Sequence, residues 1–123
     1  MGESTVHEFK DTQAFNDFVD NNEFVVINFC ATWSSQSSQM NMTFSLLSRE
    51  HPKVNFVQLD IDEMDEISQL YSVSKVPTFK FLRSSELVDT YVGTHSDMLT
   101  EKVKLFSEDA KAVKEAETTK TAD

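Results

Sequence analysis

Apolar residues follow helical and strand spacing in turn along the first third of the chain. The short apolar segment 6–9 precedes Phe15, Phe18 and Val19, whose i, i+3, i+4 spacing predicts one face of a helix. Residues 24–30 (FVVINFC) are nearly continuously apolar and β-branched, which is typical of a strand buried on both faces. The pattern therefore predicts a short strand, a helix and then a central strand.

A polar segment, residues 32–38 (TWSSQSS), interrupts the apolar pattern directly after the central strand. Met40, Phe44 and Leu47 follow at i, i+4, i+7 and predict a helix that begins at once. The serine cluster is therefore expected on a strand-to-helix turn.

A second strand–helix unit occupies the middle of the chain. Residues 54–59 read as a strand, and Asp62 is expected to cap the helix after it. The predicted inner face of that helix consists of Met64, Ile67, Leu70 and Tyr71.

Two strands and a long helix are predicted after Val76-Pro77. Phe79 and Phe81 alternate, and the run 87–92 follows after the short connection 83–86, so these segments predict an antiparallel hairpin. Apolar positions with helical spacing then predict a last helix that starts near Ser96 and fades beyond Val113; they are Leu99, Val103 and Phe106.

The resulting order, β-α-β-α-β-α-β-β-α, predicts an α/β protein with a central mixed five-stranded sheet flanked by four helices on its two faces. At 123 residues and 39% hydrophobic, the chain is long enough for one domain and too short for two. We expect the domain to span residues 1–107. Residues 108–123 are expected to form the end of the last helix and a flexible linker or tail, because from about Glu115 onward no apolar face remains.

Charge and cysteine content exclude several classes of function. A net charge of -10 disfavours nucleic acid and acidic lipid surfaces as partners. No apolar run approaches the ~20 residues of a membrane span, and the first residues do not resemble a signal peptide. We expect a cytoplasmic protein, with an additional nuclear pool left open, that is monomeric as a fragment. The single cysteine, Cys30, rules out an internal disulfide, and no Cys/His metal cluster can be assembled.

Several segments resemble the thioredoxin family, in family order and at family spacing. They are residues 25–33 (VVINFCATW), 59–62 (LDID), 75–79 (KVPTF) and Gly93. The resemblance covers residues 5 to 107 approximately and implies the thioredoxin fold. It also implies that Ser34 and Ser37 occupy the positions of the redox pair. Val76-Pro77 would be the cis peptide that faces this pair across a groove.

Serine at both pair positions removes the chemistry of the family. Thiol–disulfide exchange needs a thiolate nucleophile and a second thiol that resolves the mixed disulfide, and a serine hydroxyl supplies neither. Where active thioredoxins carry a buried aspartate on the central strand, this chain has Asn28, which cannot relay a proton. As written, the chain is not expected to catalyse dithiol exchange.

A narrower resemblance is carried by residues 33–41 (WSSQSSQMN) and 92–96 (VGTHS). Both are similar to the N-terminal thioredoxin-like domain of multidomain monothiol glutaredoxins, proteins of redox and iron–sulfur handling. The Cys-Gly-Phe-Ser motif of the glutaredoxin domain, which holds glutathione and an iron–sulfur cluster, is absent. Neither cofactor is expected here unless a glutaredoxin domain follows in the parent protein.

The resemblance implies a non-catalytic protein-interaction domain that receives a partner protein in a groove. The expected groove residues are Trp33, Ser34, Ser35, Gln36, Ser37, Val76 and Pro77. Three alternatives stay open. The serines can act only as helix caps. The natural protein can be a thioredoxin-type disulfide oxidoreductase in which cysteine at position 34, 37 or both has been replaced by serine, or a stand-alone chaperone or scaffold of thioredoxin fold.

Two other features favour structural interpretations. Cys30 lies on an apolar strand, where a thiol is usually buried and unreactive. An acidic group between positions 60 and 66 lacks the glycine and ligand spacing of a calcium loop, so a solvated helix start is the better interpretation; it consists of Asp60, Asp62, Glu63, Asp65 and Glu66.

Overall fold

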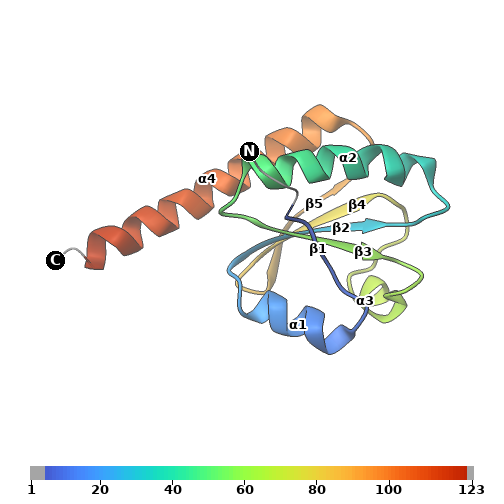
Figure 1. The fold of residues 1–123 in the computed structure, drawn as a ribbon, viewed down its shortest axis with the longest axis horizontal. Helices are drawn as coiled ribbons and strands as arrows, with labels where there is room; N and C mark the ends of the chain where they lie inside the picture. Colours follow the sequence, from blue (N-terminus) through green and yellow to red (C-terminus); the bar gives the residue numbers. More distant parts are fainter. Residues whose placement is uncertain (1–4, 122–123) are drawn as a thin grey trace.

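A five-stranded mixed sheet with helices on both faces forms the protein (Figure 1). The structure, a computed structural model, describes residues 5–121 and the side chains of residues 5–116. The strands are β1 (His7–Glu8), β2 (Phe24–Cys30), β3 (Asn55–Asp60), β4 (Thr78–Arg83) and β5 (Glu86–Val92). The helices are α1 (Thr12–Asp20), α2 (Ser35–Glu50), α3 (Asp65–Leu70) and α4 (Ser96–Thr121). The predicted α/β architecture and the order of its elements are confirmed.

The sheet order is β1-β3-β2-β4-β5, so β2 lies in the middle. β1, β3 and β2 are parallel, whereas β4 runs antiparallel to β2 and β5 antiparallel to β4. All seven residues of β2 are buried, which explains why its sequence is apolar on both faces.

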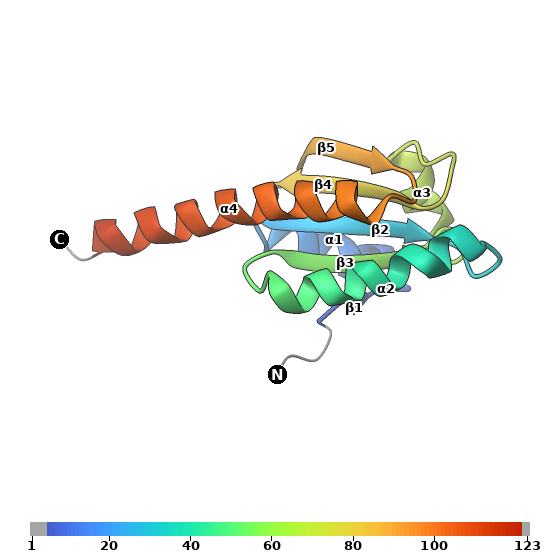
Figure 2. The ribbon, with the colours of Figure 1, turned by 90° about the horizontal axis from the view of Figure 1, so that it is seen from above.

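The helices divide between the two faces of the sheet, with α2 and α4 on one face and α1 and α3 on the other (Figures 1 and 2). The face under α2 and α4 buries Phe44, Phe79 and Phe106 among others. The opposite face buries Phe15 and Phe29. Because successive strand residues point to opposite faces, β2 contributes to both cores.

The strand register gathers three distant segments at one end of the sheet. β2 ends at Cys30, and the chain then turns into α2 at Ser35. Phe29 pairs with Thr78, so the segment just before β4 lies beside the end of β2, and Thr78 in turn pairs with Val92 at the end of β5. The turn after β2, the start of β4 and the end of β5 therefore meet.

Helix α3 differs from its predicted form. The helix starts at Asp65, its N-cap position is Met64, and no side chain caps it, so the predicted capping by Asp62 is wrong. Leu70 is 73% exposed and is not part of the inner face. The buried stripe follows positions 64, 67, 68 and 71 at i, i+3, i+4, i+7, with Tyr71 half-buried, and position 70 lies outside that stripe.

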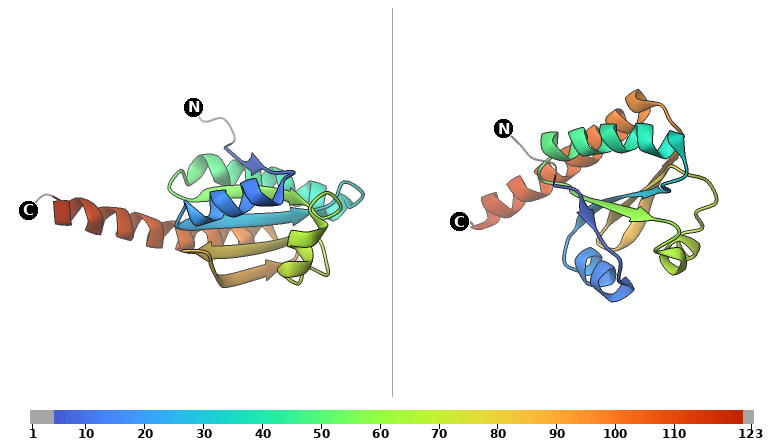
Figure 3. Two further views of the ribbon diagram at one scale, coloured as in Figure 1. Left: turned by 90° about the horizontal axis from the view of Figure 1, so that it is seen from below. Right: turned by 45° about the vertical axis from the view of Figure 1, so that its right-hand side comes forward.

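Helix α4 continues through residues 108–121, the range expected to hold its end and a flexible tail. Val113 makes the last apolar contact with the core. Beyond it the helix projects from the rest of the protein (Figures 1 and 3). Five of the eight residues 114–121 are lysine, glutamate or alanine, which are good helix formers, and the other three are threonine. Residues 122–123 lie outside the described part.

Candidate functional site

Ser34 caps helix α2 at the turn after β2. Its backbone is extended (φ -102°, ψ 115°), and its Oγ accepts a hydrogen bond from the Ser37 N–H at 3.1 Å. An N-cap serine satisfies one of the backbone donors that the first helical turn leaves free. The capping role considered for the serines therefore holds for Ser34.

The other serines of the turn face elsewhere. Ser37 is fully buried, and its Oγ has no hydrogen-bond partner within the described part of the chain. Ser35 is exposed on the first helical position. Both lie in the first turn of α2, where residues two positions apart are about 200° apart around the helix axis, so Ser35 and Ser37 point in nearly opposite directions.

A groove of about 430 Å³ opens between the turn, the segment before β4 and the end of β5. Its lining residues are Trp33, Ser34, Gln36, Lys75, Val76, Pro77, Val92, Gly93 and Thr94. The Val76–Pro77 peptide bond is cis. Five of the seven expected groove residues line it. Ser37 is buried and Ser35 is exposed, and neither is among the lining residues.

Four lining residues were missed as site residues by the sequence analysis: Lys75, Val92, Gly93 and Thr94. Each belongs to a segment that carries the family resemblance, so the signal was present. The pairing of Thr78 with Val92, which brings β5 to the groove, is a tertiary fact that spacing does not reveal.

Trp33 is the exposed aromatic residue of the groove, at 68% exposure. Its indole Nε1 donates a hydrogen bond to Asp62 Oδ2 at 3.0 Å. This bond holds the ring against the loop after β3 while most of the side chain stays exposed to solvent. An oriented, exposed aromatic side chain is typical of a binding surface rather than of a core.

Gly93 closes the β5 side of the groove and has a conformation and surroundings that require glycine. Its φ is +154°, and a Cβ at this position would lie 2.7 Å from the Tyr91 hydroxyl oxygen. That hydroxyl accepts a hydrogen bond from the His95 N–H at 3.0 Å, which ties the end of β5 to the start of α4. A side chain at position 93 would displace this contact.

Asn28 belongs to β2 and is fully buried, with its side chain in contact with Asn41 of α2. The resemblance places an acid/base group at this position. Its Nδ2 donates to Asn41 Oδ1 at 2.8 Å and to Gln58 Oε1 at 3.2 Å. Its Oδ1 has no partner among the described residues. The carboxamide carries no titratable proton in the neutral pH range, so this position provides hydrogen bonds and no proton transfer.

The one thiol of the chain belongs to Cys30, which is 6% exposed and donates to the Leu59 carbonyl oxygen at 3.5 Å. Burial, with added effects of the negative Asp60 and Glu8, raises the pKa of the Cys30 thiol from 9.0 to about 11. Thiolate is the reactive form of cysteine, so this thiol is poorly reactive at neutral pH.

No other chemical machinery accompanies the turn. The hydroxyl of Ser34 contacts a backbone N–H, and no contact with a base activates either serine among residues 5–116, whose side chains the structure describes. The same range contains no group of three or more His, Cys, Asp or Glu residues able to hold a metal ion. Within it, no helix is both long enough and apolar enough to span a membrane.

Comparisons with known proteins agree on the fold. The family model described as Thioredoxin matches residues 5–105. Glutaredoxin-3 of Mus musculus is 42% identical over 80 residues, which make up 65% of this chain and 24% of that protein. A monothiol glutaredoxin of Arabidopsis thaliana is 39% identical over 79 residues, 64% of this chain and 16% of that protein. The chain thus spans a quarter or less of these two relatives.

Among solved structures, thioredoxin NaTrxh from Nicotiana alata superposes with a TM-score of 0.81 at 26% sequence identity. The superposition covers 86% of this chain and 96% of that one. The similarity therefore extends over nearly the whole of a thioredoxin, whereas it reaches only a small part of the glutaredoxins.

Proposed function

Because the chain belongs to the thioredoxin family, we propose that it is a protein-interaction domain that does not catalyse dithiol–disulfide exchange. The observation that carries this proposal is that the binding surface of the groove is present while the thiols expected beside it are replaced by serines. The exposed Trp33 and the Val76-Pro77 wall are present, whereas both positions expected to hold thiols are Ser34 and Ser37. A surface suited to partner binding is retained without the atoms that the reaction needs.

The partner is an extended segment of another protein. The β4 ladder begins at Thr78, so the backbone of Val76 lies beyond the sheet, and within the described range it makes no backbone hydrogen bond. Such a backbone can pair with an added strand, and a side chain of that strand can pack on Trp33. Ligands of other kinds are disfavoured, because the net charge of -10 opposes nucleic acid and anionic membranes.

The parent protein is, in our proposal, a monothiol glutaredoxin of redox and iron–sulfur handling in the cytoplasm. Two relatives carry that name or the name glutaredoxin-3, and each is several times longer than the matched region. Glutathione and an iron–sulfur cluster would then belong to another domain of the parent. The domain itself would act as a monomer.

Two measurements test the proposal together. The first is reduction of insulin disulfides in the presence of thioredoxin reductase or glutathione, for which we expect no turnover above background. The second is selection of a random octapeptide library displayed on phage, from which we expect peptides that bind the wild type and are lost with Trp33→Ala. Turnover, or the absence of any peptide that depends on Trp33, would refute the proposal.

The alternative is a thioredoxin-type oxidoreductase whose cysteines have been replaced. One observation favours it: the fold matches that of a thioredoxin over nearly its full length. Sequencing codons 34 and 37 of the natural gene separates the two. Cysteine at both positions would favour the oxidoreductase, and cysteine at position 37 alone would favour the monothiol-glutaredoxin parent.

A further inference from the structure

We infer that the partner segment is basic, and that one of its Lys or Arg side chains lies over the Trp33 ring and pairs with Asp62. This inference rests on the proposed function and adds the chemistry of the partner. Three features of the groove and its surroundings carry it: the carboxylates beside Trp33, the hydrogen bond that links them to the ring, and the position of Lys75.

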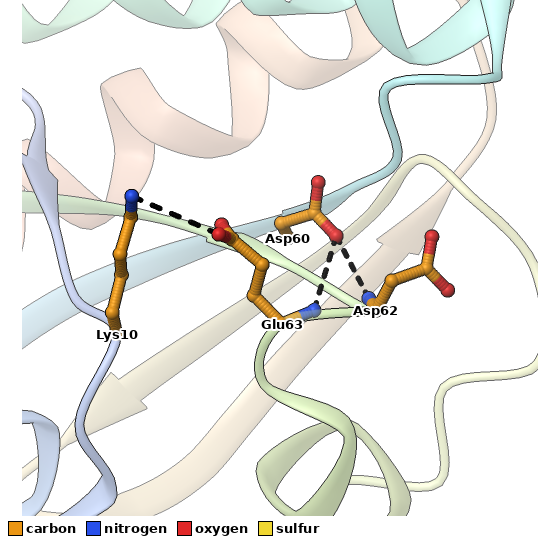
Figure 4. Close-up of polar contacts among 4 residues, drawn as sticks. All are labelled: Lys10, Asp60, Asp62 and Glu63. Carbon is orange, nitrogen blue, oxygen red and sulfur yellow. Dashed lines mark hydrogen bonds and ion pairs between the residues drawn. The ribbon is translucent and has the colours of Figure 1, made fainter.

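Three carboxylates lie at the end of β3 and directly after it, and one of them, Asp62, contacts Trp33. We call Asp60, Asp62 and Glu63 the acidic loop (Figure 4). Asp60 Oδ1 accepts the backbone N–H groups of Asp62 at 2.8 Å and Glu63 at 3.3 Å, which gives the loop a defined conformation. The backbone of the loop is therefore held in place before a ligand binds.

This acidic loop is poorly neutralised. In the described part of the chain, its one ion pair joins Lys10 Nζ to Glu63 Oε2 at 3.7 Å, and both side chains are largely exposed. Exposed pairs of this kind contribute little. Figure 4 shows the Asp62 carboxylate directed away from Lys10. Asp60 and Asp62 thus keep their negative charge for a ligand.

Trp33 connects the acidic loop to the groove. Because its Nε1 donates to Asp62 Oδ2 at 3.0 Å, a cation placed over the exposed indole is also within reach of that carboxylate. Aromatic faces attract cations, Trp most strongly, and a carboxylate beside the ring adds Coulomb attraction. The Trp33 ring and the Asp62 carboxylate therefore both favour a positively charged group at the same position of the groove.

Lys75 restricts where the basic residue can lie. It is exposed and lines the groove beside Val76, on the wall across from the turn that bears Trp33. A cation of the partner would be repelled there and attracted at Trp33. We therefore expect a basic residue at Trp33, an apolar residue over Val76 and Val92, and an uncharged or acidic residue near Lys75.

A second copy of this chain is a poor occupant of the groove. Each copy carries a net charge of -10, so two copies repel one another. The general negative field would also attract basic peptides anywhere on the surface, and the experiment must separate that field from the acidic loop.

The test compares two double variants with the same net charge of -8, obtained from -10 by removing two carboxylates. Asp60→Asn with Asp62→Asn removes two of the three charges of the loop, and the asparagine oxygens can still accept the bonds from Trp33 and the backbone. Glu108→Gln with Asp109→Asn neutralises two exposed residues on α4 and serves as the matched control.

The peptides selected on the wild type by their dependence on Trp33 are then sequenced and titrated calorimetrically against all three proteins. We expect enrichment in Lys and Arg. For the loop variant we expect affinity lowered about 3- to 10-fold, against less than about 2-fold for the control, on the scale of two exposed charge pairs. Trp33 is the only tryptophan, so its fluorescence verifies on the wild type that the peptide binds there.

Two results would overturn the inference while leaving the proposed function in place. One is a set of Trp33-dependent peptides without basic enrichment, and the other is an equal loss of affinity in both double variants. Self-association of the wild type through the groove in sedimentation experiments would also overturn it. Failure to select any Trp33-dependent peptide would instead refute the proposed function itself.

Discussion

Replacing Ser34 and Ser37 by alanine, one at a time, should change the stability of the protein in opposite directions. The Ser34 hydroxyl accepts the Ser37 N–H and is 8% exposed, so little water can replace it when the oxygen is removed. Loss of an N-cap serine costs about 1 kcal/mol, and an amide left unsatisfied near the core adds to that. We expect Ser34→Ala to lower the free energy of unfolding by about 1 to 2 kcal/mol.

Ser37→Ala should be neutral or stabilising. The Ser37 hydroxyl is 0% exposed and has no hydrogen-bond partner among the described residues, so the folded state bears the cost of its dehydration without compensation. Removing it relieves that cost, and alanine is also the better helix former. We expect a gain of 0 to about 1 kcal/mol, reduced by the small void that the oxygen leaves.

The assay is urea unfolding followed by far-ultraviolet circular dichroism. Fluorescence is unsuitable, because Trp33 is largely exposed in the folded state and changes little on unfolding. Ser35→Ala, at an exposed position of the same turn, is the control and should change stability by less than about 0.5 kcal/mol. If Ser37→Ala proved as destabilising as Ser34→Ala, the Ser37 hydroxyl would have a partner and the assignment of capping to Ser34 alone would be wrong.

Three further predictions concern the chemistry of the fold. The double variant Ser34→Cys with Ser37→Cys should form a reducible disulfide but reduce insulin slowly, because Asn28 offers no acid/base group. Adding Asn28→Asp should accelerate the reduction of insulin, and equal rates with and without Asn28→Asp would contradict this. Cys30 should react with a thiol reagent at neutral pH only after unfolding, since a pKa of about 11 instead of 9.0 lowers its thiolate fraction about 100-fold; rapid labelling of the folded protein would contradict it. Burial of the ring, aided by Lys111 and opposed by Glu50, lowers the pKa of His51 below 6.5. The unfolded state therefore binds a proton at His51 more readily than the folded state does. The free energy of unfolding is highest above pH 6.5 and decreases as pH falls through the folded-state pKa of His51. Urea unfolding on both sides of pH 6.5 should show a lower free energy of unfolding at the lower pH in the wild type, and a smaller decrease in His51→Asn.

Most of the fold could be predicted because each element buries apolar residues with its own period. The run 24–30 reads as a doubly buried strand and proves to be the middle of the sheet. Of the serine cluster expected on the turn, Ser34 is the N-cap and the others lie in the first turns of α2. Errors fall where local spacing competes with tertiary contacts. Asp62 looks like a helix cap, yet its carboxylate accepts the bond from the Trp33 indole 29 positions away in the chain.

The residues that line the groove were predicted in part, because only some of them can be assigned without the tertiary structure. Trp33, Gln36 and Val76 follow from the family resemblance and do line the groove. Val92 and Lys75 were not assigned to it, because their place depends on how β5 pairs with β4 and on the path of the chain before β4.

The kinds of elements, their order and the absence of thiols at positions 34 and 37 follow from the sequence alone, since they depend on local periodicity and residue identity. The different roles of the two serines emerge only from the folded chain: Ser34 is a cap, and Ser37 is a buried hydroxyl with no partner among the described residues, because the first turn of α2 faces the core at position 37. The tertiary structure also decided that Trp33 is held by Asp62 at the edge of the groove. A hydrogen bond between residues so distant in the chain arises from packing, and no local pattern encodes it.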